Sequence, residues 1–209
     1  KVQKRTTADI AKRIVQDIPD GAHVNLGIGQ PMTISNYLPS DKEILLHSEN
    51  GLLGMGPLAK GHEIDEELVN AGKQPVTMLP GASLCHHADS FVMIRGGHID
   101  ICVLGAFQVS VKGDIANWRT GDPKAIPAVG GAMDLALGAK KLFVMMEHLT
   151  KSGESKLVKE CTYPLTALAA VECVYTDLAT IAVTPEGLAA VDWVDGLSFE
   201  DLQVLSGVP

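Results

Sequence analysis

The chain has 209 residues, of which 46% are hydrophobic and 20% are charged, and its formal net charge at pH 7 is −8. This length suits one domain with a sizeable core, and the negative charge argues against nonspecific binding to nucleic acid or to an anionic membrane. An anionic ligand would need cations that are placed locally or supplied by a partner. No stretch approaches the ~20 apolar residues of a membrane span, and no signal peptide opens the chain, so we expect a cytoplasmic protein.

Predicted helices and strands alternate along the chain. Apolar residues recur at helical spacing over residues 6–18, a strand follows at 23–26, a helix that begins with Pro31 reaches residue 38, and a strand is predicted at 43–47. Further strands are expected at residues 76–79, 99–104, 141–146, 167–174 and 178–183, and further helices at 63–70, 88–95, 132–137 and 198–204. The alternation predicts one domain, residues 1–209, of the α/β class, with a mostly parallel central sheet and helices on both of its faces.

The cysteines and histidines of the chain do not indicate a metal site. The four cysteines are far apart and no CxxC motif is present, which is typical of reduced packing residues in the cytoplasm. The segment Cys85-His86-His87-x-Asp89 contains metal-ligating residue types, but adjacent histidines on one turn rarely face the same ion. We therefore expect structural hydrogen bonds or the edge of a substrate pocket there.

Three polar or glycine-rich turns are candidates for ligand binding. Residues 25–31 and 47–54 each follow a strand, and a turn at Gly130-Gly131 precedes a helix. In open α/β sheets, ligands bind beyond the carboxyl ends of the strands. Gly27-x-Gly29 lacks the third glycine of a dinucleotide fingerprint, so it fits a tight turn as well as a ligand loop. Free N–H groups at Gly130 and Gly131 would suit an oxyanion, although these glycines could also form only a turn.

Glu49 is the sharpest candidate for chemistry. It follows a predicted strand and stands between Ser48 and Asn50, with glycines after it. A carboxylate that is desolvated and correctly aimed is a competent nucleophile toward an activated acyl group. Spacing alone leaves open the alternative of an ordinary glutamate in a surface turn.

The segment that contains Glu49, residues 47–54, resembles the signature of the B subunit of class I (3-oxoacid) CoA-transferases. The resemblance runs from about Thr6 to Pro209, and further blocks occur in the family's order at residues 25–29, 96–100, 104–109, 113–118, 130–135, 147–148 and 161–165. It implies an open α/β fold like that of sugar-phosphate isomerases. It also implies that Glu49 is the nucleophile of a ping-pong reaction that passes through a glutamyl-CoA thioester.

The resemblance implies roles for other residues and for a partner. Gly130 and Gly131 are expected at the oxyanion, Asn25 is expected to orient the substrate or the glutamate, and Gly27, Gly29 and Asn50 are possible pocket residues. No metal or redox cofactor is expected, since coenzyme A is both a substrate and a transient covalent adduct. An A subunit should supply much of the CoA site and form a heterodimer with this chain, which would assemble further into an A2B2 heterotetramer.

Two stretches, residues 105–114 and 202–209, resemble the branch of the family that moves CoA from succinyl-CoA to 3-oxoadipate in the breakdown of aromatic compounds. Residues 119–123 depart from the Met-Ile-Pro-Gly-Lys of many acetoacetate-type members, which weakens an acetoacetate assignment. Acetoacetate or a short fatty acid nevertheless stays open as the acceptor. A sugar-phosphate isomerase-like or ligand-binding domain is the alternative from another class, and an inactive scaffold is disfavoured because Glu49 stands in its full motif. Residues 151–156 are expected to form a solvated loop, or else to lie near the CoA phosphates.

Overall fold

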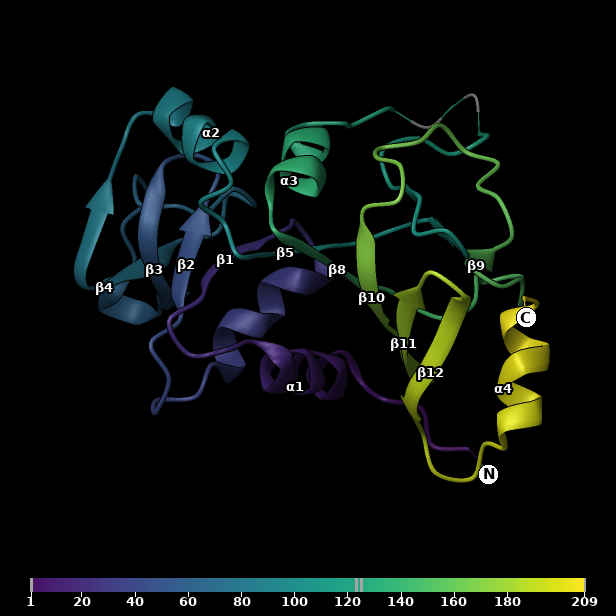
Figure 1. Cartoon of the computed structure of the whole chain (residues 1–209). Coiled ribbons are helices and arrows are strands. Elements are labelled where there is room, and N and C mark those ends of the chain that lie inside the picture. The colour runs from purple at the N-terminus through teal and green to yellow at the C-terminus, as the bar shows by residue number, and fades with distance from the viewer. Residues whose placement is uncertain (1, 123, 125, 209) are drawn as a thin grey trace.

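A nine-stranded sheet organises the computed structural model, which describes residues 2–122, 124 and 126–208 (Figure 1). Pro123 and Pro209, which end two stretches named above, lie outside the described residues. The strands of this sheet are β1 (His23–Leu26), β2 (Leu45–Ser48), β3 (Leu52–Leu58), β4 (Val76–Leu84), β5 (Ile101–Leu104), β8 (Lys141–Met145), β10 (Val171–Tyr175), β11 (Ala179–Thr184) and β12 (Gly187–Trp193). A second, three-stranded sheet contains β6 (Gln108–Ser110), β7 (Ile115–Ala116) and β9 (Leu157–Val158).

The order of the large sheet is β12-β11-β10-β8-β5-β1-β2-β3-β4. The five central strands from β10 to β2 are parallel to their neighbours, whereas β3 and β4 at one edge and β11 and β12 at the other pair antiparallel. The α/β class is therefore confirmed. The description of the sheet as mostly parallel is accurate only for its centre, because hairpins build both edges.

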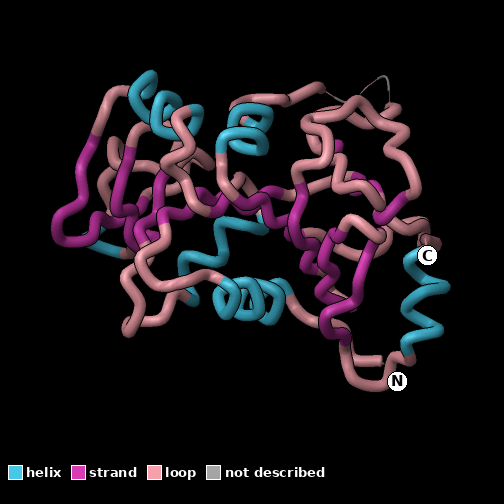
Figure 2. Tube along the Cα trace, in the orientation of Figure 1, coloured by secondary structure: helices cyan, strands magenta, loops and turns pink. Residues whose placement is uncertain are grey.

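Helices cover both faces of the sheet, as expected (Figures 1 and 2). Helix α1 (Thr7–Asp17) and the 3-10 helix η1 (Gln30–Tyr37) lie on one face, and α2 (His87–Arg95) and α3 (Ala132–Gly138) lie on the other. Each face has its own apolar core, one around Ile14 and Ile34 and the other around Ile94 and Leu135. Helix α4 (Phe199–Ser206) lies beyond β12, and a short 3-10 turn, η2 (Gly61–Glu63), precedes β4.

The start of α1 follows from its first residues. The Thr6 hydroxyl accepts a hydrogen bond from the Asp9 N–H at 3.2 Å, and the Asp9 carboxylate accepts one from the Thr6 N–H at 2.9 Å. This reciprocal capping box satisfies donors that a helix start leaves free. The helix then buries Ile10, Ala11, Ile14 and Val15 against the sheet.

Two of the expected helices differ from prediction. Residues 30–37 form a 3-10 helix because the hydroxyls of Thr33 and Ser35 donate to carbonyls three residues earlier, which suits the tighter winding. The helix predicted at 63–70 is wrong. Asp65 accepts a hydrogen bond from the Glu67 N–H and Asn70 accepts one from the Gln74 N–H, so the side chains hold the backbone in turns.

Strands β3, β6, β7, β9 and β12 were not predicted. Strand β3 contains Gly54, Gly56 and Pro57, and such residues normally weaken a strand, so its sequence does not predict one. The glycines instead allow close packing on β4: a Cβ atom at Gly56 would lie 2.4 Å from Thr77 Oγ1, and one at Gly54 would lie 2.9 Å from Ala82 Cβ.

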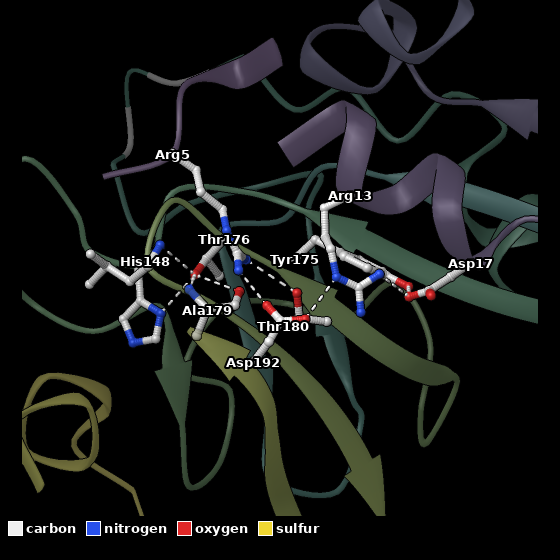
Figure 3. A network of polar contacts seen from close by, with 10 residues as sticks. Arg5, Arg13, Asp17, His148, Tyr175, Thr176, Ala179, Thr180 and Asp192 are labelled. Atoms are coloured by element: carbon white, nitrogen blue, oxygen red, sulfur yellow. Dashed lines mark hydrogen bonds and ion pairs between the residues drawn. The ribbon is translucent and has the colours of Figure 1, made fainter. Parts of the chain in front are cut away.

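A dense polar network ties α1 to the β10–β12 edge of the sheet (Figure 3). Asp192 on β12 accepts hydrogen bonds from Arg5 and, at 2.7 Å, from Arg13 Nε. Arg13 also pairs with Asp17 at 2.7 Å, and Asp17 in turn accepts a hydrogen bond from the Tyr175 hydroxyl at 2.7 Å. Every charged group of this network has a charged or hydrogen-bonding partner.

Candidate functional site

Glu49 lies in the tight turn that joins β2 to β3. Ser48 pairs with Leu52 across the hairpin, and the Gly51 N–H donates to the Ser48 carbonyl at 2.9 Å. Gly51 has φ +113°, and a Cβ atom there would lie 2.2 Å from the Cys85 carbonyl oxygen. The Cys85 N–H also donates to the Gly51 carbonyl at 2.8 Å. Only glycine fits this position, so the turn that presents Glu49 is held in one place.

The Glu49 carboxylate is half-buried and makes no hydrogen bond or ion pair with any other described residue. Burial raises the pKa of Glu49, and the electrostatic effect of the nearby His87 partly offsets it. A partly desolvated carboxylate without a partner keeps its oxygen atoms available to a ligand.

Glu49 lies where two cavities meet. The first has a volume of about 460 Å³ and extends past Gly27, Gly105 and Phe107. The second, of about 740 Å³, is lined by the start of α2, including His87. A substrate can therefore approach the carboxylate with one part in each cavity.

Gly130 and Gly131 line both cavities beside Glu49. A Cβ atom at Gly131 would lie 3.8 Å from Glu49 Cδ and 2.8 Å from Phe91 Cζ, so the missing side chain brings the backbone close to the carboxylate. Gly131 is the N-cap of α3, and in the described part of the chain neither glycine N–H donates a hydrogen bond to another residue. Both N–H groups are therefore available to an anionic group that binds beside Glu49.

Asn25 lies beneath the site and not on its wall. It is 1% exposed, and its amide donates to the His47 carbonyl at 3.2 Å and lies 3.0 Å from His47 Nδ1. Burial lowers the pKa of His47 to about 4, so the ring is neutral, and because Nδ1 accepts from Asn25 the proton is assigned to Nε2, which is 2.8 Å from the Ser90 hydroxyl. Asn25 lines neither cavity and holds the β2 end that carries Glu49, so of its two expected roles this placement favours orientation of the glutamate.

The other three predicted pocket residues are split between the wall and the surface. Gly27 lines the 460 Å³ cavity, where a Cβ atom would lie 2.9 Å from the Val103 carbonyl oxygen. Gly29 and Asn50 do not line either of the two cavities. The Asn50 side chain donates to the Val69 carbonyl at 2.8 Å, which stabilises the turn.

Sequence reasoning did not single out several residues of the cavity wall, including Phe107, Glu147 and Lys156. Lys156 belongs to the 151–156 segment that was expected to be a solvated loop or else to lie near the CoA phosphates, and the first description fits its exposed first residues only. The signal that could have found Lys156 is its position directly before the buried Leu157, because a strand places neighbouring side chains on opposite sides.

The segment with metal-ligating residue types forms the start of α2. His86 is its N-cap, and His86 Nδ1 accepts a hydrogen bond from the Ala88 N–H at 3.1 Å. Within residues 2–122, 124 and 126–208, no group of three or more His, Cys, Asp or Glu side chains is arranged to hold a metal ion. No helix in the same part of the chain is long and apolar enough to cross a membrane.

Comparisons with known proteins show the family of the chain. A family model described as coenzyme A transferase matches residues 7–195. The chain is 63% identical over 207 residues to the B subunit of the 3-oxoadipate CoA-transferase of Pseudomonas putida, and the match covers 99% of this chain and 97% of that relative.

Two solved structures share the fold at low sequence identity. An acyl-CoA transferase apoenzyme from Escherichia coli O157:H7 superposes with a TM-score of 0.74 at 17% identity, over 94% of this chain and 39% of that one. This chain thus spans about two fifths of the length of that enzyme. Glutaconate CoA-transferase from Acidaminococcus fermentans gives a TM-score of 0.70 at 17% identity, over 100% of this chain and 87% of that one.

Proposed function

Because the chain belongs to the coenzyme A transferase family, we propose that Glu49 is its nucleophile and that it moves CoA from succinyl-CoA to 3-oxoadipate. The observation that carries this proposal is the placement of Glu49, an unpaired carboxylate in a rigid turn at the junction of two cavities. The acceptor is the one named for the Pseudomonas putida relative, at 63% identity over nearly the whole chain.

The proposed reaction exchanges one thioester for another. A Glu49 oxygen attacks the succinyl-CoA carbonyl, the C–S bond breaks, and CoA leaves as the thiolate, so that a succinyl-glutamyl anhydride forms. The thiolate then attacks the glutamyl carbonyl, and succinate leaves with the electron pair of the broken C–O bond. A carboxylate of 3-oxoadipate attacks the resulting glutamyl-CoA thioester, and the same two steps run in reverse.

No electrons or protons are gained or lost over the cycle, so the proposed chemistry requires no metal or redox cofactor. Each tetrahedral intermediate carries an oxyanion, and the free N–H groups of Gly130 and Gly131 are the candidate donors. Loss of one such donor typically costs about 10²–10³ in rate.

The proposal includes a second type of subunit. The relative from Pseudomonas putida is named as the B subunit of its enzyme, which implies that an A subunit is its partner there. The two cavities at Glu49 are open, and this chain has a net charge of −8, so a partner that covers the site and supplies cations would complete it for anionic CoA. We therefore propose a heterodimer of A and B chains that assembles into an A2B2 heterotetramer.

The test uses the Glu49→Gln variant in the complex with the A subunit. Glutamine keeps the size of the side chain and removes the nucleophile, so we expect CoA exchange to fall by at least about 10³-fold. Intact-mass analysis after exposure to succinyl-CoA should show a CoA-sized adduct on the Glu49 peptide of the native chain and none on the variant. Glu186→Gln, in the exposed turn between β11 and β12, is the matched control and should behave as the native chain.

Turnover retained by Glu49→Gln would contradict the nucleophile assignment. An acceptor panel tests the substrate separately. Turnover of acetoacetate in clear preference to 3-oxoadipate would contradict the proposed acceptor and leave the chemistry of Glu49 in place.

A further inference from the structure

Lys156 stands out among the residues that line the 460 Å³ cavity. In the described part of the chain it is the one lysine or arginine on that wall. Most other residues of the wall are glycines or have apolar side chains, and Glu49 lies where the cavity meets its neighbour. A positive charge that faces the same cavity as the candidate nucleophile is a candidate for substrate recognition.

The backbone fixes the direction of the Lys156 side chain. The Lys156 N–H donates to the His148 carbonyl at 3.0 Å, and its own carbonyl accepts from the Val109 N–H at 3.0 Å. The next residue, Leu157, is 1% exposed and packs into the core. Because neighbouring side chains of an extended segment point in opposite directions, burial of Leu157 turns Lys156 toward the cavity.

The Lys156 amine has no fixed partner. It is half-buried and forms no ion pair or hydrogen bond with another described side chain. Burial lowers the pKa of Lys156, and the charges of Glu147 and Asp177 work against that effect. The acid on the same wall, Glu147, is exposed and accepts a hydrogen bond from Gln30 Nε2 at 3.4 Å, and Asp177 pairs with Lys4 at 2.8 Å.

Lys156 and Glu49 belong to different ends of the cavity. Glu49 follows β2, whereas the backbone of Lys156 is bonded to His148, just after β8. Strands β1 and β5 lie between β2 and β8, so three interstrand spacings, about 14 Å, separate the ends of the two strands beyond which Glu49 and Lys156 lie. The lysine side chain extends into this space, so a substrate that reacts at Glu49 meets the cation with its far end.

We propose that Lys156 binds the carboxylate that lies remote from the reacting group of a dicarboxylic substrate. Succinyl-CoA carries such a carboxylate beyond its thioester, and 3-oxoadipate carries one at the end opposite to its reacting carboxylate. Lys156 thereby selects dicarboxylic over monocarboxylic acids of the same length. This inference rests on the proposed function, because it assumes that acyl transfer occurs at Glu49.

The test compares Lys156→Met with the native chain, both assembled with the A subunit and loaded as the glutamyl-CoA thioester by excess succinyl-CoA. Two acceptors are offered to the loaded enzyme: 3-oxoadipate, and 3-oxohexanoate, which has the same six-carbon chain with a methyl group in place of the remote carboxylate. Loss of a charge-assisted contact should lower the second-order rate of thioester consumption by 3-oxoadipate about 10–100-fold, and that by 3-oxohexanoate by less than about twofold.

Three further variants keep the test falsifiable. Lys156→Arg should recover part of the preference because it restores the charge, and Lys156→Gln should lose it because a polar side chain without charge cannot replace the cation. Lys159→Met removes an exposed lysine outside the cavity wall and should leave both rates unchanged. Equal losses for the two acceptors, or no loss for either, would overturn the role of Lys156. Absence of the thioester in the native complex would instead overturn the proposed function.

Discussion

The carboxylate at the Glu49 site has no partner in the described part of the chain, whereas the carboxylates in the network around Asp192 are paired. In the network, Asp192 is shared by Arg5 and Arg13, and Asp17 accepts from both Arg13 and Tyr175 (Figure 3). At the site, Glu49 has no partner among the described residues. The two regions belong to the same sheet, and both are only partly exposed to solvent.

The difference separates groups that stabilise the fold from groups that are available for chemistry. Burial alone would raise the pKa of Asp192, but hydrogen bonds from Arg13 and Arg5 outweigh it and hold that pKa below its ordinary value. The pKa of Glu49 is raised because burial is the larger effect there. An unpaired charge at a partly buried position costs stability, so its presence indicates that a ligand or a partner completes the site.

The largest expected effect comes from the turn that presents Glu49. In Gly51→Ala, the new methyl group would meet the Cys85 carbonyl oxygen at 2.2 Å, and φ +113° is unfavourable for alanine. We expect the free energy of unfolding to fall by about 3–4 kcal/mol, with loss of CoA exchange because Glu49 moves. Denaturant titration and an exchange assay measure both quantities.

Gly187→Ala is the matched control for that experiment. Gly187, the first residue of β12, has φ +126°, but a Cβ atom there would meet nothing within 4 Å. The free energy of unfolding of this variant should fall by only about 1–2 kcal/mol, because of backbone strain, and CoA exchange should be kept. Equal losses of unfolding free energy in Gly51→Ala and Gly187→Ala would show that close packing on Cys85 does not hold the turn that carries Glu49.

The next effect concerns pH. The folded-state pKa of His47 is about 4, below its ordinary value of 6.5, so between these values the unfolded chain binds a proton that the folded chain does not. Stability should therefore fall as the pH decreases from 6.5 to 4, by about 3 kcal/mol for this residue. Burial lowers the pKa of His148 too, which adds a contribution of the same sign.

Unfolding titrations between pH 4 and pH 7 measure how steeply the free energy of unfolding changes with pH, in the native chain and in His47→Gln. The glutamine variant should lose the His47 contribution to the slope, whereas His62→Gln, at an exposed position, should keep the native slope. An unchanged slope in His47→Gln would mean that the ring beneath Glu49 is not held neutral.

The smallest effects test the comparison itself. Asp192→Asn leaves two arginines without their anionic partner and should lower the free energy of unfolding by roughly 1–2 kcal/mol, since Asp192 keeps about a third of its exposure. Glu49→Gln should raise the free energy of unfolding by up to about 1 kcal/mol, because it removes an unpaired charge. A loss of stability in Glu49→Gln would show that the carboxylate has a structural partner.

Patterns that are local in sequence predicted much of this molecule. The apolar spacing around Ile10 and Ile14, the helix start at Pro31 and the strand before Glu49 each depend on a few neighbouring residues. The position of Glu49 at a strand end was predicted for the same reason. The roles of Glu49, Gly130 and Gly131 stay predictions, and the Glu49→Gln experiment tests the first of them.

What the sequence could not predict depends on contacts between distant residues. Gly54 and Gly56 resemble strand breakers until β4 is seen to pack directly on them. Asn25 looks like a ligand residue because it lies near the end of a strand beside glycines, and only the fold places His47 beside it on the neighbouring strand. Lys156 is one of several lysines in its region, and its cavity is formed by segments that are more than 100 residues apart.

Few of the residues that line the two cavities lie within strands; most belong to loops or to the helices α2 and α3. Substitutions at positions such as Phe107 or Val129 can therefore alter which acid is accepted without disturbing the ladder hydrogen bonds of the sheet. This separation of framework from lining makes the fold evolvable: a lineage can acquire a new carbon source while Glu49 and its turn stay as they are.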